Sequence, residues 1–226
     1  MSRAGVQCKL GGVQSWVVCL SAAMFFFYIF IQMNFFNAIE KDLFKSFHIS
    51  STQMASITQM YFYGNVFFLV PAGLMLDYFS TRRLLLCATS LCVICTWWFA
   101  HSASIMQAEI ARFIVGMSGA FCLLGPVRLA TRWFPPARMA LVVGVVVTMA
   151  MIGGMFAQTP FLLLTDRFGY SKALYVDVLL GLVIVFLIFA CVKDLPPGHS
   201  ESDAHSGAGI PVLKVLARVL GNAQNW

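Results

Sequence analysis

The hydrophobic positions of this chain fall into six long runs, which are separated by shorter polar segments. An α-helix needs about 20 apolar residues to cross the ~30 Å hydrocarbon core of a bilayer, and the runs have about this length. Strands of a membrane barrel are about half as long and alternate apolar with polar residues, which these runs do not do. The pattern predicts an all-α membrane protein whose six transmembrane helices are Val13–Phe36, Met54–Leu76, Leu84–Ala100, Ala108–Ala130, Ala140–Leu164 and Ala173–Val192.

The composition of the chain agrees with a lipid environment. Hydrophobic residues make up 60% of its 226 residues and charged residues only 11%, whereas a soluble domain carries about 25% charged residues. The formal charge of +6 does not indicate a nucleic-acid partner, because the basic residues lie between the apolar runs, where they set topology. Cys92 and Cys95 form a C-x-x-C pair inside the third run without a second pair, so packing is expected rather than metal binding, and no cofactor is predicted.

The distribution of Lys and Arg predicts the orientation of the helices. With the N-terminus inside, ten basic residues lie in inner segments and four in outer segments, as the positive-inside rule requires. Both termini are therefore expected in the cytoplasm, at the cell (inner) membrane, or at a lysosomal membrane if the source is eukaryotic. The inner residues are Arg3, Lys9, Arg82, Arg83, Arg128, Arg132, Arg138, Lys193, Lys214 and Arg218, and the outer residues are Lys41, Lys45, Arg167 and Lys172.

Two polar segments carry signals for helix boundaries. In the first outer loop, Ser50 or Ser51 is placed to cap the second helix, and the apolar residues within 43–47 have the spacing of a short interfacial helix. Between the fourth and fifth helices, residues 132–138 read Arg-Trp-Phe-Pro-Pro-Ala-Arg. The prolines are expected to end the helix, the aromatic residues to lie at headgroup level, and the arginines to face the cytoplasm.

The composition changes after the sixth run. Residues 193–209 form a polar segment rich in Ser, Gly and Pro, which is typical of a flexible linker. Residues 211–221 then show the spacing of a short basic amphipathic helix. Two domains are expected: a six-helix transmembrane bundle over 1–192, and a cytoplasmic linker with an amphipathic helix over 193–226 that leads to a missing second half.

A charged turn between the second and third helices carries a resemblance to a known family. From Gly73 it reads Gly-x-x-x-Asp-x-x-x-x-Arg, which resembles the loop signature of the major facilitator superfamily, G-x-L-x-D-R-x-G-R-R/K. Asp77 follows a helix, whose dipole disfavours an anion at that end, so it is expected to pair with an arginine on the same membrane face. The resemblance implies that Gly73, Asp77, Arg82 and Arg83 form a conformational latch between two six-helix halves. A turn that only sets topology is the alternative.

Arg112 lies inside the fourth predicted helix, in the segment Arg-Phe-Ile-Val-Gly-Met-Ser-Gly, which resembles the family's pattern on this helix. An arginine within a membrane is costly and is by default a functional-site hypothesis. The alternative is a structural pair with Glu109, three residues earlier on the same helix face. Gly116 and Gly119 are expected to let neighbouring helices pack closely.

Further polar residues lie within the predicted helices. In lipid, buried amides must face protein or water. The resemblance implies that the first helix lines a central cavity, and interhelical hydrogen bonds are the alternative. The cavity candidates are Tyr28, Gln32, Asn34, Tyr61, Asn65, Arg112 and Gln158, and the candidates for proton coupling are Glu109 and Asp177.

The resemblance implies a transporter, with this chain as its N-terminal half. The aromatic segments within 25–30 and 61–64 are similar to those of the branch that contains the lysosomal dipeptide transporter and its bacterial relatives. Expected is secondary active or facilitative transport of a small organic solute by alternating access, with dipeptides or amino acids as one substrate class. The alternatives are a proton-coupled symporter of organic anions and, in another class, a non-transporting membrane assembly partner. The family's drug-antiporter signature is not matched, because Thr148 and Met149 stand where it has Gly-Pro.

The expected partners follow from the same reading. They are a small-molecule substrate, the lipid bilayer, and either the missing C-terminal half or a second copy of the chain. An enzyme is not expected. No Ser/His/Asp or metal constellation occurs in the sequence, and the four histidines fall in predicted loops or at a helix edge.

Overall fold

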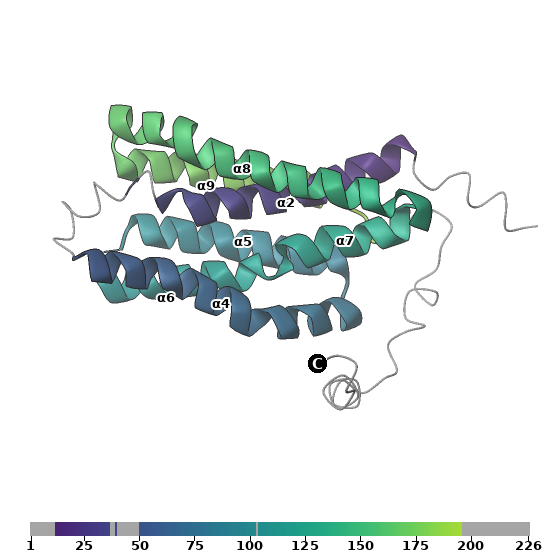
Figure 1. The fold of residues 1–226 in the computed structure, drawn as a ribbon, viewed down its shortest axis with the longest axis horizontal. Coiled ribbons are helices and arrows are strands. Elements are labelled where there is room, and N and C mark those ends of the chain that lie inside the picture. The colour runs from purple at the N-terminus through teal and green to yellow at the C-terminus, as the bar shows by residue number, and fades with distance from the viewer. Residues whose placement is uncertain (1–11, 37–38, 40–49, 103, 196–226) are drawn as a thin grey trace, which may run out of the picture.

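The computed structural model describes residues 12–36, 39, 50–102 and 104–195. These residues form helices and no strand, and six spans are long and apolar enough to cross a membrane, as the hydrophobic pattern predicts (Figure 1). The predicted interfacial helix within 43–47 and the segment 196–226 lie outside the described residues. The helices are α2 (Val13–Asn34), α4 (Ser51–Tyr78), α5 (Thr81–Ala100), α6 (Ile105–Gly119), α7 (Phe121–Trp133), the 3-10 turn η1 (Pro136–Arg138), α8 (Met139–Phe168) and α9 (Tyr170–Cys191).

Local signals in the sequence explain where several helices begin and end. Ser50 starts α4 with a capping box, in which its side chain accepts from the Gln53 N–H and the Gln53 side chain accepts from the Ser50 N–H. Helices α8 and α9 are joined through Gly169, whose φ of +83° is a conformation that favours glycine. Most other ends lie up to four residues outside the predicted bounds, because helical hydrogen bonding continues into the polar ends of each run.

The fourth predicted helix is not continuous, which corrects the sequence-based prediction. It breaks at Ala120 into α6 and α7. Three glycines and Pro126 fall within the eleven residues from Gly116 to Pro126. Glycine weakens a helix, and Pro126 has no N–H to donate and crowds the carbonyl four residues before it. The membrane span is nevertheless preserved, because α6 and α7 together cover Ile105–Trp133.

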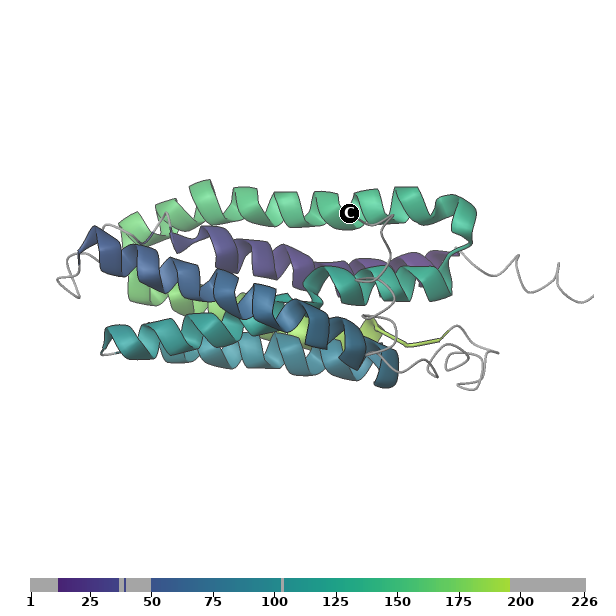
Figure 2. The ribbon, with the colours of Figure 1, turned by 60° about the horizontal axis from the view of Figure 1, so that its bottom comes forward.

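Helix α2 is the centre of the bundle. Two thirds of its most apolar stretch (67%) is buried, against 22% for both α4 and the span of α8. It packs against α8 and α7, while α4 packs on α6 and α5 packs on α9 and α6 (Figures 1 and 2). The helices run nearly side by side along the long axis of the molecule. One end of the bundle, the Asp77 end, holds the α4–α5 turn, and the other, the Ser50 end, holds the start of α4.

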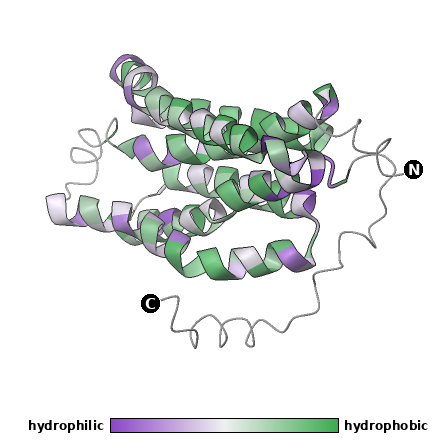
Figure 3. Ribbon diagram, turned by 45° about the vertical axis from the view of Figure 1, so that its right-hand side comes forward, coloured by the Kyte–Doolittle hydropathy of each residue, from purple (hydrophilic) through white to green (hydrophobic). Residues whose placement is uncertain are grey.

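The outward faces of α4, α8 and α9 are apolar, and Figure 3 shows hydrophobic residues along the length of the bundle. Phe67 is 74% exposed, Met155 71% and Phe186 70%. A soluble protein rarely exposes so many large apolar side chains together. In a bilayer the same faces contact lipid or another membrane segment, so the structure is that of a multi-pass membrane protein.

Close helix contacts rest on glycine. A Cβ built on Gly116 of α6 would lie 2.0 Å from the backbone oxygen of Tyr61 in α4, and one built on Gly64 of α4 would lie 2.1 Å from the backbone oxygen of Phe113 in α6. Gly153 of α8 meets the Phe27 backbone in the same way. The packing role predicted for Gly116 is therefore confirmed.

The segment after α7 stops the helix as predicted, and its aromatic residues are buried within the bundle. Trp133 and Phe134 are both 2% exposed. The Trp133 indole Nε1–H donates to the Lys193 carbonyl (3.1 Å), and the Phe134 ring meets Trp16 edge-on. They are buried because the end of α7 packs against the start of α2, which provides an apolar contact, while the segment after α9 provides a hydrogen-bond partner.

Candidate functional site

Arg112 is the most unusual polar residue of the bundle. Helix α6 holds it in the interior, where it is 1% exposed, and none of its guanidinium nitrogens has a hydrogen-bond partner in the described structure. Aromatic rings surround the cation instead. Its central carbon lies 4.3 Å from the ring centre of Phe36, 5.1 Å from Tyr61 and 5.4 Å from Phe35. Cation–π attraction offsets part of the desolvation cost but supplies no hydrogen-bond acceptor to the N–H groups.

Glu109 does not neutralise Arg112. Its carboxylate accepts a hydrogen bond of 2.5 Å from the Ser56 hydroxyl of α4, and no salt bridge joins it to Arg112. The local pair that was the structural alternative is therefore not formed, because the Glu109 side chain turns to the neighbouring helix. Glu109 links α6 to α4 and lies apart from the buried guanidinium.

Asp177 is the second buried charge. It lies in α9, is 2% exposed, and accepts a hydrogen bond through Oδ2 from the Gln32 side chain of α2. Its Oδ1 has no hydrogen-bond partner in the described structure. The Tyr28 side chain adjoins this carboxylate, and an electrostatic attraction connects Asp177 with Arg112. The structure thus gathers predicted residues from four helices into one buried group, the Arg112 cluster, which consists of Tyr28, Gln32, Tyr61, Arg112 and Asp177.

The remaining cavity candidates lie outside this cluster. The Asn34 amide donates to the Phe30 carbonyl within its own helix (2.9 Å), and the Asn65 amide donates to the Gly116 carbonyl (3.4 Å). Only the Asn65 bond, which joins α4 to α6, is an interhelical hydrogen bond of the kind that the alternative for the polar residues describes. Gln158 is exposed on α8, where it lines a separate pocket of about 340 Å³.

Sequence reasoning missed the apolar part of the site. Phe35 and Phe36 frame the guanidinium, and Thr96 of α5 adjoins Tyr28. A signal for the two phenylalanines was present, since they follow Gln32 by three and four residues and so fall on the same helix face. No spacing in the sequence pointed to Thr96, because it reaches the cluster through the packing of a different helix.

The charged turn at the Asp77 end divides its interactions between two neighbours. Asp77 forms a salt bridge of 2.7 Å with Arg128 of α7, in which Asp77 is 65% and Arg128 20% exposed. Arg82 does not contact Asp77. Its guanidinium donates to the Phe189 carbonyl (2.7 Å), and its backbone N–H donates to Asp194 Oδ1 (2.9 Å).

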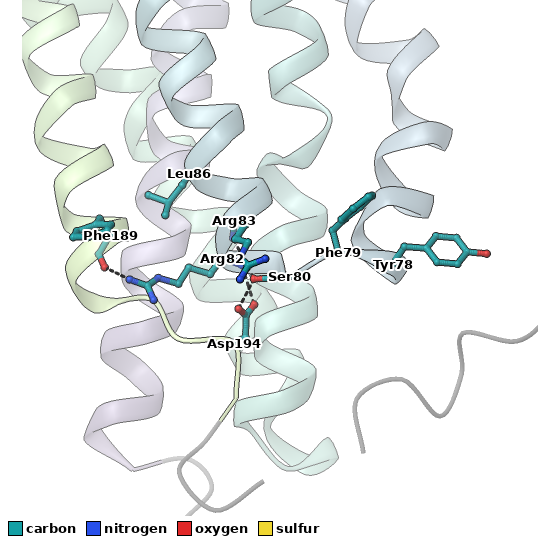
Figure 4. Close-up of a pocket in the computed structure, with 8 residues that line it drawn as sticks. All are labelled: Tyr78, Phe79, Ser80, Arg82, Arg83, Leu86, Phe189 and Asp194. Carbon is teal, nitrogen blue, oxygen red and sulfur yellow. Dashed lines mark hydrogen bonds between the residues drawn. The ribbon is translucent and has the colours of Figure 1, made fainter. Parts of the chain in front are cut away.

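Asp194 therefore caps α5 from the far end of the described chain. Its Oδ2 accepts from the Ser80 hydroxyl (2.5 Å) while Oδ1 accepts from the Arg82 N–H. Figure 4 shows this carboxylate between Ser80 and Arg82, with Phe189 beyond and Tyr78 and Phe79 turned away. The surrounding pocket has a volume of about 530 Å³. A carboxylate is favourable here because helix N-termini attract anions.

Replacing Asp194 with Asn is expected to loosen the start of α5. The amide keeps one acceptor oxygen but loses the charge, and a hydrogen bond to a charged group is worth about 1.5–3 kcal/mol when buried and less at this partly exposed site. Amide hydrogen exchange checks this. The Arg82 N–H should exchange several-fold faster in Asp194→Asn, while amides in the middle of α5 keep their rates. Unchanged exchange at Arg82 contradicts the capping role.

The fold defines a class, that of polytopic membrane proteins built from six apolar helical spans. The family model of the Major Facilitator Superfamily matches residues 20–225. The chain belongs to this superfamily. Its fold matches the crystal structure of a bacterial homologue of the human lysosomal transporter Spinster, in the inward-facing and unoccupied conformation, with a TM-score of 0.72, 16% identity, and coverage of 84% of this chain and 45% of that one.

Curated relatives are bacterial proteins of greater length. Multidrug resistance protein Stp of Mycobacterium tuberculosis is 25% identical over 74% of this chain and 32% of its own length. The probable sulfoacetate transporter SauU of Cupriavidus necator is 22% identical over 69% of this chain and 36% of its own. Drug efflux pump JefA of M. tuberculosis is 24% identical over 77% and 35%. The matches thus span about a third of the length of these relatives.

Proposed function

We propose that the chain provides the N-terminal half of a transporter that moves a small carboxylate-bearing organic solute across a membrane by alternating access. The observation that carries the proposal is the buried guanidinium of Arg112, whose donors have no partner in the described structure. A buried cation without partners is expensive, and sites that keep one usually do so for a ligand. A carboxylate fits the planar fork of arginine with two parallel hydrogen bonds.

The unpartnered donors of the Arg112 guanidinium favour an anionic group over a cationic or neutral one. Sulfoacetate, named for the relative from Cupriavidus necator, is an acid of this kind. Amino acids and dipeptides also carry a carboxylate and remain within the proposed class. The names of the two M. tuberculosis relatives favour drug export, but α8 has Thr148 and Met149 where the antiporter signature has Gly-Pro.

Alternating access requires a second bundle that faces this one. We assign that role to a C-terminal half or to a second copy of the chain, with the termini cytoplasmic and the Ser50 end outside. The Asp77–Arg128 pair lies at the inner end in this orientation, where the latch of Gly73, Asp77, Arg82 and Arg83 would engage the second bundle. The linker and amphipathic helix of 193–226 would connect to it.

Asp177 is the stronger of the two candidates for proton coupling. It is buried and attracts Arg112 electrostatically, whereas Glu109 is partly exposed and hydrogen-bonded to Ser56. A proton on Asp177 would remove the negative charge that competes with the solute for Arg112. Transport by this site would then be a symport, and a uniport is the outcome if the Asp177→Asn variant transports as the wild type does.

A ligand panel tests the proposal. The purified chain in lipid nanodiscs is titrated with acetate, glycine, alanyl-alanine, sulfoacetate, and the uncharged acetamide, with thermal stability as the readout. Ligand that binds only the folded state raises the melting temperature. Stabilisation by one or more carboxylates and none by acetamide is expected. A melting temperature that responds to no anion contradicts the proposed substrate class and favours a non-transporting assembly partner.

A further inference from the structure

A pocket opens at the Ser50 end of the bundle beside the Arg112 cluster. It has a volume of about 350 Å³, which is enough for a small organic solute. Three of its side chains are polar, which is costly on a face that meets hydrocarbon and suits one that meets water or protein. The pocket, called here the Phe36 pocket, is lined by Phe36, Ser51, Met54, Ala55, Thr58, Gln59 and Phe62.

Phe36 belongs both to this pocket and to the surroundings of Arg112. Its ring lines the pocket, and its ring centre lies 4.3 Å from the central guanidinium carbon, nearer than the described rings of Tyr61 and Phe35. Only 3% of the residue is exposed. Phe35 and Phe99 hold the ring, with centre-to-centre distances of 4.8 and 5.5 Å. One aromatic side chain therefore adjoins both the pocket and a buried cation whose donors have no partner among the described residues.

We propose that Phe36 is a side-chain gate and that the Phe36 pocket is the first binding station of the solute on its way to Arg112. This inference rests on the proposed function. The solute binds first among Phe62, Thr58 and Gln59, with its carboxylate toward the Phe36 ring. The ring then rotates away, and the carboxylate takes its place at the guanidinium.

Arg112 exchanges one partner for another when the gate opens. With the gate closed, Arg112 has the π-face of Phe36 against it. With the gate open, it has the carboxylate, which makes stronger and directional hydrogen bonds. A ligand shifts a conformational equilibrium by its difference in affinity for the two states, so an anionic solute favours the open gate and an uncharged one does not. The gate thus selects for charge.

Arginine modification tests the gate. Phenylglyoxal adds to accessible guanidinium groups, and peptide mass spectrometry of the full chain in nanodiscs reports the rate at each arginine. Exposed Arg83 serves as the internal reference. In the wild type, Arg112 should react far more slowly than Arg83. In Phe36→Ala the Arg112 rate should rise about tenfold or more, as expected for a buried group that becomes locally accessible, with Phe36→Leu between the two.

Phe35→Ala is the matched control. Phe35 is also buried (1% exposed) and also faces Arg112, at 5.4 Å, but it does not line the pocket. Its replacement should change the Arg112 rate much less than Phe36→Ala does. Equal acceleration in both variants would mean general loosening and overturns the gate, as does an Arg112 rate that stays at the wild-type value in Phe36→Leu and Phe36→Ala.

The same assay separates the gate from the proposed function. Acetate at saturating concentration should protect Arg112 in Phe36→Ala if the guanidinium binds carboxylates. Acceleration without protection by any carboxylate of the panel retains the gate and contradicts the substrate class. Protection without a difference between the Phe36 and Phe35 variants retains the substrate class and contradicts the gate.

Discussion

Replacing Gly116 with alanine is expected to destabilise the bundle more than the same change at Gly64 or Gly153, because its Cβ would make the shortest contact. The new Cβ would lie 2.0 Å from the backbone oxygen of Tyr61 and 2.8 Å from its carbonyl carbon. A side chain can rotate away from such a clash, but a helix backbone cannot, so α4 and α6 must separate. Overpacking costs about 1–3 kcal/mol where side chains adjust, and about 3 kcal/mol or more is expected here.

Gly144→Ala is the matched control, because a Cβ on this residue of α8 meets no described atom within 4 Å. Alanine is also the better helix former, by about 1 kcal/mol in exposed helices. Unfolding in mixed detergent, followed by circular dichroism, compares the two variants with the wild type. Gly116→Ala should lose stability and Gly144→Ala should keep or gain it. A Gly116→Ala protein as stable as the Gly144→Ala protein would show that α4 and α6 do not cross as closely as the structure has them.

The hydrophobic pattern was enough to predict the six spans, because a bilayer allows few alternatives to apolar helices of fixed length. The break at Ala120 was not predicted. A hydrophobic run does not report whether the hydrogen-bond ladder within it is continuous, and only the cluster of glycines before Pro126 signals the interruption. The burial of the aromatic residues after α7 was not predicted for a related reason. A tryptophan at a helix end has the same sequence signal whether it faces headgroups or packs under another helix, as Trp133 does.

The candidate site was predictable in kind but not in arrangement. A polar residue in an apolar run is conspicuous, so Gln32, Arg112 and Asp177 were singled out individually. Whether these three residues lie close together depends on how α2, α6 and α9 pack, and the sequence of a single helix does not reveal that packing. Glu109 shows the limit of arguments from one helix, because its nearest charge along the chain was Arg112, and its actual partner is Ser56 on a different helix. Asp194 shows the same limit, because this residue caps α5, a helix that begins 113 residues earlier in the chain.

Arg112→Gln is expected to abolish carboxylate binding and to leave the bundle at least as stable as the wild type. Loss of two charge-assisted hydrogen bonds to the ligand corresponds to about 3 kcal/mol, or about a hundredfold in affinity. Arg112→Lys keeps the charge without the planar fork and should lose about tenfold. Stability should not fall, because the variant removes a buried cation whose donors have no partner in the described structure, and Asp177 keeps its hydrogen bond from Gln32.

The combination of these two outcomes distinguishes a ligand-binding arginine from a structural one. If Arg112 served mainly to neutralise Asp177, its loss would leave a buried carboxylate without its counter-charge and lower the unfolding free energy, as the breaking of buried ion pairs does. Titration of acetate or alanyl-alanine against nanodisc-embedded variants measures the affinity, and detergent unfolding measures the stability. Arg138→Gln, an exposed arginine between α7 and α8 at the opposite end of the bundle, is the control and should change neither. A destabilised Arg112→Gln protein with wild-type affinity would show that Arg112 stabilises the fold and does not bind the carboxylate of the solute.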